Sequence, residues 1–164
     1  NDEGRGRLLG EFSADERILV VSSSGYVKLI TYDLSNHFPD DVLIIEKFDP
    51  KKIMNCIYYS LDNKTYYLKR FRVELNNREN YFLPDKKGVK LDSFFYKNEK
   101  INLIFKDSKT GKKRDNIIID PNEFISVKGI KALGKQLSNK PIKEYNLIED
   151  QINERKRKKK GKME

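Results

Sequence analysis

Short apolar runs rich in Val, Ile, Tyr and Phe recur along this chain, separated by polar turn residues every eight to twelve positions. This pattern is typical of an all-β domain, because half-buried strands are short and the turns between them need Gly, Asn, Asp or Ser. Ile18 to Val21 precedes Tyr26 to Tyr32, and Ser23, Ser24 and Gly25 lie between them. Gly25 tolerates the positive φ of a tight turn, so these two runs predict a β-hairpin.

Two further pairs of apolar runs predict two more hairpins. Ile57 to Tyr59 precedes Thr65 to Phe71 across a four-residue turn. Ile101 to Phe105 precedes Asn116 to Ile119 across a longer loop that contains Gly111. The stretch from Phe124 to Leu147 is also strand-like.

The hairpins follow one another in a loosely repeating frame. Each is preceded by a run that ends in an aromatic residue, then a charged turn, then an Ile. The aromatic residues are Phe12, Phe48 and Phe95, so the repeat lengths are 36 and 47 residues. Repetition of a four-strand unit at this period predicts a propeller-like array of about three four-stranded blades. An unrelated series of hairpins in a β-sandwich is the alternative.

We expect one β domain over residues 1–149, as part of a longer subunit, and a basic tail over residues 150–164. Seven of the eight residues from Arg155 to Lys162 are basic. The tail combines good helix formers with a high charge, so it is expected to be a short helix or disordered.

The charge balance favours a polyanion as the partner. The chain has 34 Lys and Arg against 25 Asp and Glu, a net charge of +9. Basic residues alternate with apolar ones in the expected strands, at Lys28 and around Lys69, Arg70 and Arg72. Since successive side chains of a strand point to opposite faces, one face can pack while the other presents cations. Glycine-rich basic stretches add candidate phosphate contacts at Arg5, Arg7, Lys128, Lys131 and Lys135.

Catalytic and metal-binding chemistry is not expected in this chain. Cys56 is the single cysteine and His37 the single histidine, so no cluster at metal-ligand spacing exists. None of the nine tyrosines stands out as a nucleophile. No cofactor is expected, and no apolar stretch has the length of a membrane helix.

The segment from Ile18 to Lys28 resembles a hairpin that recurs in the C-terminal domains of the A subunits of DNA gyrase and topoisomerase IV, the bacterial type IIA topoisomerases. An aliphatic strand there reaches a polar turn with Gly, then an aromatic residue, then a basic one. The stretches from Gly4 to Gly10 and from Val127 to Lys135 resemble the Gly- and Lys/Arg-rich strands that link blades in that family. The resemblance covers most of residues 4–149.

This resemblance implies a β-pinwheel, a propeller-like disc whose blades exchange strands and whose basic outer surface bends duplex DNA. It implies double-stranded DNA, the rest of the A subunit and the ATPase B subunit as partners, in the bacterial cytoplasm. ATP, magnesium and the DNA-cleaving tyrosine would belong to other parts of the enzyme. The basic, glycine-rich box of the gyrase A subunit is at best degenerate here, from Arg5 to Gly10, which favours a role like that of topoisomerase IV.

Two other functions remain open from the sequence. A β-repeat scaffold for protein partners would have an exposed apolar patch. An RNA-binding β-module would need exposed aromatic residues on a sheet face, and the pairs Tyr58-Tyr59 and Tyr66-Tyr67 keep that possibility open.

Overall fold

The computed structural model describes residues 16–31, 38, 40–74, 78–96 and 99–149. These residues form eleven strands and one four-residue helix. In chain order they are β1 (Arg17–Ser22), β2 (Tyr26–Thr31), β3 (Val42–Lys47), β4 (Ile53–Ser60), β5 (Thr65–Arg72), β6 (Asn80–Tyr81), β7 (Val89–Phe95), β8 (Glu99–Phe105), β9 (Ile117–Ile119), α1 (Pro121–Phe124), β10 (Lys135–Gln136) and β11 (Ile142–Glu149). The predicted all-β class is confirmed.

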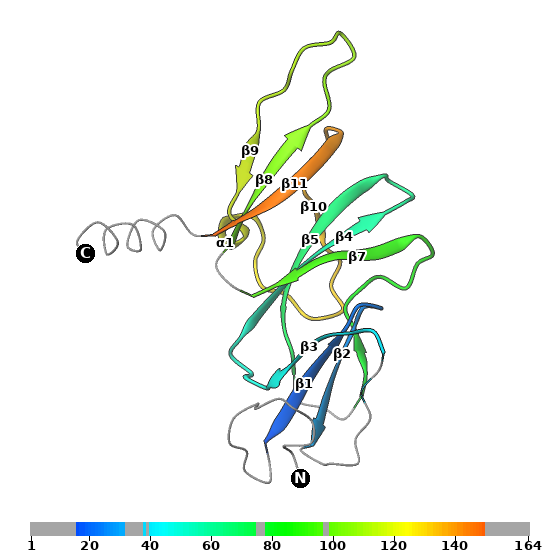
Figure 1. The fold of residues 1–164 in the computed structure, drawn as a ribbon, viewed down its shortest axis with the longest axis vertical. Helices are drawn as coiled ribbons and strands as arrows, with labels where there is room; N and C mark the ends of the chain where they lie inside the picture. Colours follow the sequence, from blue (N-terminus) through cyan, green and yellow to red (C-terminus); the bar gives the residue numbers. More distant parts are fainter. Residues whose placement is uncertain (1–15, 32–37, 39, 75–77, 97–98, 150–164) are drawn as a thin grey trace, which may run out of the picture.

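The strands form three sheets that follow one another along the molecule (Figure 1). The first sheet has the order β3-β1-β2-β6, the central sheet β10-β5-β4-β7 and the third sheet β11-β8-β9. Each is built around one predicted hairpin: β1 pairs with β2, β4 with β5 and β8 with β9, all antiparallel. The blade array predicted from the sequence is therefore present, with three strands in the third sheet among the described residues.

The strand that precedes each later hairpin belongs to the sheet before it. β3 lies beside β1, and β7 lies beside β4. The sequence repeat instead predicts that these runs, at 42–48 and 91–95, belong to the same sheet as the hairpin that follows each of them. That prediction is wrong, because the apolar pattern identifies a strand but not the strand with which it pairs. The corresponding first run, from Leu8 to Phe12, lies outside the described residues.

Neighbouring sheets also exchange strands. The first sheet is completed by β6, which comes from beyond the central hairpin and pairs with β2. The central sheet is completed in the same way by β10, which comes from beyond the third hairpin and pairs with β5. Each of these sheets therefore depends on chain that arrives from the next unit, as the family resemblance implied.

One hydrophobic core lies between the first and central sheets, and a second lies between the central and third sheets. In the first core, Leu19, Val21 and Val27 of the first sheet pack with Cys56 and Phe71 of the central sheet. In the second core, Ile57 and Leu68 of the central sheet pack with Ile101, Leu103 and Phe105 of the third. The central sheet is therefore covered on both faces, and β4 and β5 are buried along most of their length.

The first hairpin turn requires glycine for two reasons. Gly25 has a φ of +100°, and a Cβ placed there would lie 2.5 Å from Leu83 Cδ1 and 3.0 Å from Leu83 Cβ. Gly111, in the third hairpin loop, has a φ of +83° but no atom within 4 Å of such a Cβ.

We predict that Gly25→Ala lowers the free energy of unfolding by about 2 to 3 kcal/mol, because positive-φ strain adds to a clash with Leu83. Gly111→Ala carries the strain without the clash, so about 1 kcal/mol is expected. Urea unfolding of the two variants tests this. Equal losses would contradict the packing of Leu83 on this turn.

Candidate nucleic-acid interface

Lys69 and Arg70 are adjacent on β5 and point to opposite faces of the central sheet. Lys69 shares its face with Phe71 of the first core, while Arg70 shares its face with Leu68 of the second. Both are buried, with 2% and 6% of their surface exposed. Charged side chains are rarely buried unless their donors are satisfied.

Lys69 joins the first sheet to the segment that leads into β10. Its ammonium donates hydrogen bonds to the carbonyl of Phe82, at 2.7 Å, and to the carbonyl of Ile130. It also lies 5.6 Å from the centre of the Phe71 ring. Burial lowers the pKa of Lys69 to about 8, since the interior disfavours the charged form.

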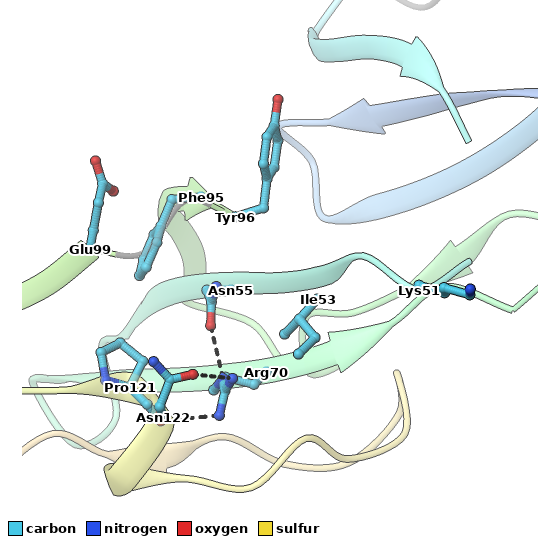
Figure 2. Close-up of a pocket in the computed structure, with 9 residues that line it drawn as sticks. All are labelled: Lys51, Ile53, Asn55, Arg70, Phe95, Tyr96, Glu99, Pro121 and Asn122. Carbon is cyan, nitrogen blue, oxygen red and sulfur yellow. Dashed lines mark hydrogen bonds between the residues drawn. The ribbon is translucent and has the colours of Figure 1, made fainter. Parts of the chain in front are cut away.

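Arg70 holds the turn that contains α1 (Figure 2). Its guanidinium donates to Asn55 Oδ1 at 3.1 Å, Asn122 Oδ1 at 2.9 Å and the carbonyl of Ile125 at 2.8 Å. A longer bond of 3.3 Å reaches the carbonyl of Pro121. The guanidinium lies at the wall of an open cavity of about 250 Å³, whose other lining residues include Lys51 and Glu99.

Lys69 and Arg70, both predicted to contact phosphate, are buried and bonded within the protein, so we do not propose them as DNA contacts. Their donors are directed at protein carbonyls and amides, and little of either side chain reaches the surface. The alternation around these residues predicted one packed face and one cationic face. In the central strand both faces pack, so the two cations have a structural role instead.

The other predicted contacts that fall within the described residues are exposed, but they do not all lie together. Lys28 lies on the face of the first sheet that points away from the first core, and Arg72 ends β5. Lys128, Lys131 and Lys135 belong to a single segment. Arg5 and Arg7 lie outside the described residues.

That segment, residues 125–141, links α1 to β11, and we call it the basic connector. It contains no Asp or Glu. It carries four lysines, all exposed: Lys128, Lys131, Lys135 and Lys140. Among the described residues, the salt bridges join Lys47 to Glu16, Lys52 to Glu46 and Lys86 to Asp62, so none includes a connector lysine.

The connector is fixed along the central sheet rather than looped into solvent (Figure 1). The amide of Lys128 donates to the carbonyl of Arg70 at 3.0 Å, and the amide of Leu137 donates to that of Tyr66 at 2.9 Å. The amide of Gly134 donates to Tyr58 Oη at 3.0 Å. Lys135 donates to the carbonyl of Phe124 and covers its ring, which leaves part of its ammonium for other partners.

Two basic features were not predicted from the sequence: Lys140 within the connector, and the β8–β9 loop at its end. Lys140 was not selected because it lies outside the glycine-rich stretch. The β8–β9 loop, residues 106–116, has five basic and two acidic residues and projects beyond the sheets (Figure 1). The amide of Lys106 donates to the carbonyl of Pro141, so the base of this loop meets the end of the connector. The high density of Lys and Arg in this loop was the available signal.

An RNA-binding module would need exposed aromatic rings on a sheet face, and a protein-binding scaffold would need an exposed apolar patch. Tyr58 stacks on Tyr67 and Tyr66 packs against Tyr59 and Tyr145, so these rings contact one another. The exposed large apolar residues are Leu43, Leu61, Tyr81, Ile117, Ile118 and Leu133. Ile117 and Ile118 are neighbours on β9, and the other four come from four different parts of the chain.

Neither a metal-binding cluster nor a helix that could cross a membrane is found in the described part of the chain. It contains no group of three His, Cys, Asp or Glu side chains placed to hold a metal ion. Its helix, α1, has four residues and is far too short to cross a membrane.

A family model described as the topoisomerase C-terminal domain of Bacteroidota matches residues 1–149. This range includes the three sheets and the whole connector. Comparison with curated proteins and with solved structures gave no match.

The opposite pKa shifts of two neighbours in the first core predict an unusual pH dependence of stability. Lys69 is paired across the strands with Cys56, and burial raises the pKa of that thiol from 9.0 to about 12. The pKa of Lys69 falls from 10.5 to about 8. Between about pH 8 and 9 the unfolded chain therefore binds one more proton than the folded chain, and stability rises with pH. From pH 9 to 10 the unfolded chain loses the thiol proton that the fold retains, and the two effects cancel.

We predict that the urea midpoint rises from pH 8 to 9 and stops rising between pH 9 and 10, where Cys56 and tyrosines with a raised pKa, such as Tyr58 and Tyr145, lose their protons first in the unfolded chain. Cys56→Ala lacks the thiol titration, so its midpoint rises relative to that of the wild type from pH 9 to 10. Identical profiles for the two proteins would show that the Cys56 thiol does not oppose the Lys69 titration, and a midpoint that does not rise from pH 8 to 9 would show that Lys69 is not the group that titrates.

Proposed function

Because the chain belongs to the topoisomerase C-terminal domain family of Bacteroidota, we propose that it binds the backbone of duplex DNA without sequence specificity and bends it. The observation that carries this proposal is the basic connector, four exposed lysines on 17 residues that contain no acid. Lysines that neutralise phosphates release condensed counterions, which is the main source of non-specific DNA affinity.

The fixed position of the connector supports backbone binding. Three amide hydrogen bonds hold it to the central sheet, so its lysines are presented with little backbone freedom to lose on binding. The projecting β8–β9 loop carries a net charge of +3 and extends the basic surface from the end of the connector. A duplex that contacted both would follow the connector, which is fixed to the central sheet, and a fixed surface of this kind imposes its shape on the DNA.

We do not propose that the domain recognises a particular DNA sequence. The helix α1 has four residues, and a recognition helix needs several turns to present side chains along the major groove. Contacts to phosphate fix position but carry no sequence information.

In the enzyme as a whole, the domain would support ATP-dependent changes of DNA topology by a type IIA topoisomerase in the cytoplasm. It would act as part of the A subunit, together with the ATPase B subunit. ATP hydrolysis and DNA cleavage would take place elsewhere, so this chain needs no cofactor of its own. The degenerate glycine-rich box at Arg5 to Gly10 favours a topoisomerase IV-like role over chiral wrapping by gyrase.

We predict that affinity for a short duplex falls steeply with salt, with a slope of log affinity against log salt of roughly −5 if about six phosphates are contacted. Replacing Lys128, Lys131 and Lys140 by Gln removes three of these contacts. The slope should then become shallower by about 3, because each lost phosphate contact contributes about 0.9. Fluorescence anisotropy over a salt series measures both values.

The matched control replaces Lys51, Lys87 and Lys90 by Gln, three exposed lysines outside the connector. It changes the net charge by the same amount, so a general loss of positive charge affects both variants equally. If the two variants lose the same slope, the connector is not the binding surface and the proposal fails.

A further inference from the structure

Leu133 is the most exposed of the large hydrophobic side chains in the described residues, with 73% of its surface in contact with solvent. It lies in the middle of the basic connector, two residues after Lys131 and two before Lys135. A single exposed leucine is common on protein surfaces. This one differs in that it is flanked in the sequence by Lys131 and Lys135 and lies on backbone that is held on both sides.

The backbone around Leu133 has little freedom to bring the side chain back to the protein. On one side, the amide of Ala132 donates to the carbonyl of Gly129, and the buried Lys69 binds the carbonyl of Ile130. On the other side, the amide of Gly134 donates to Tyr58 Oη. Leu133 therefore projects from a short, anchored span.

Gly134 shows how closely this span approaches the central sheet. A Cβ at Gly134 would lie 2.8 Å from Tyr58 Oη and 3.0 Å from the carbonyl oxygen of Leu68. The backbone lies against β4 and β5 at this residue, and the side chain before it points into solvent. Leu133 is therefore an apolar side chain that points into solvent from backbone packed against the central sheet.

We propose that Leu133 is a wedge that enters between stacked base pairs of bound DNA and kinks the duplex. This inference rests on the proposed DNA binding and names how the bend is made. Architectural DNA-binding proteins insert apolar side chains between base steps, mostly from the minor groove, and bend the duplex by partial unstacking.

The spacing of the neighbouring cations fits this role. Lys131 and Lys135 are four residues apart, so their Cα atoms lie at most about 14 Å apart. The minor groove is about 6 Å wide and its flanking phosphates lie somewhat farther apart, so the two ammonium groups can reach the two strands while Leu133 faces the groove between them. Unstacking costs a few kcal/mol per step, and flexible pyrimidine–purine steps cost least. The wedge should therefore prefer such steps.

The test uses a short duplex that contains several pyrimidine–purine steps and 2-aminopurine at the purines, whose fluorescence rises when the base is unstacked. Wild-type protein at saturation should raise the fluorescence, and Leu133→Ala should lose most of this rise. Its affinity should stay within about threefold of the wild type, and its salt slope should not change, because no phosphate contact is lost. Leu133→Phe keeps a large apolar side chain and should retain the signal.

Leu43→Ala is the matched control, since Leu43 is 50% exposed on β3 and lies outside the connector. It should behave as the wild type in both measurements. If Leu133→Ala binds and raises the fluorescence as the wild type does, or if the wild type binds without any rise, the wedge is wrong while DNA binding stands. If the wild type does not bind the duplex at all, both proposals fall.

Discussion

Two buried cations on one strand hold this molecule in its shape. Lys69 and Arg70 extend from opposite faces of β5, the strand that both cores share, and each donates to backbone carbonyls of the chain that follows β9. Lys69 also reaches the carbonyl of Phe82, beside the strand that completes the first sheet. The central sheet is therefore tied to the segment beside β6 and to the α1–β10 segment by charge-assisted hydrogen bonds, in addition to the apolar packing.

This arrangement explains why charged residues, and not apolar ones of similar size, occupy the centre. The segment from α1 to β10 crosses the central sheet without a continuous strand partner, so its carbonyls would be unsatisfied in an apolar core. A guanidinium with five donors and an ammonium with three can satisfy several such groups at once. Burying each charge costs free energy, which the hydrogen bonds offset only in part, since burial still lowers the pKa of both side chains. The outcome is an irregular but fixed connector, whose exposed lysines keep defined positions. Buried cations thus organise the segment, and exposed cations on the same segment give it its proposed function.

The sequence was informative where local pattern decides structure. All three hairpins were predicted, because alternating apolar runs and turn residues such as Gly25 are local signals. The sheet membership of β3 and β7 was not, since pairing partners are set by packing between distant segments. Lys69 and Arg70 illustrate the same limit: a period-two pattern indicates which side chains share a face, but not that both faces of β5 are covered. Lys128, Lys131 and Lys135 were selected from their glycine-rich surroundings and are exposed on one segment, whereas Lys140 has no such surroundings and was missed.

The central claim is that DNA lies along the basic connector, and lysine acetylation footprinting tests it most directly. The exposed lysines are acetylated with and without a saturating duplex, and the modified positions are quantified by mass spectrometry. The account predicts that Lys128, Lys131 and Lys140 lose reactivity when DNA is bound, while Lys51 and Lys87, exposed elsewhere on the molecule, do not change. Uniform protection of all five, or protection of Lys51 and Lys87 alone, would contradict it.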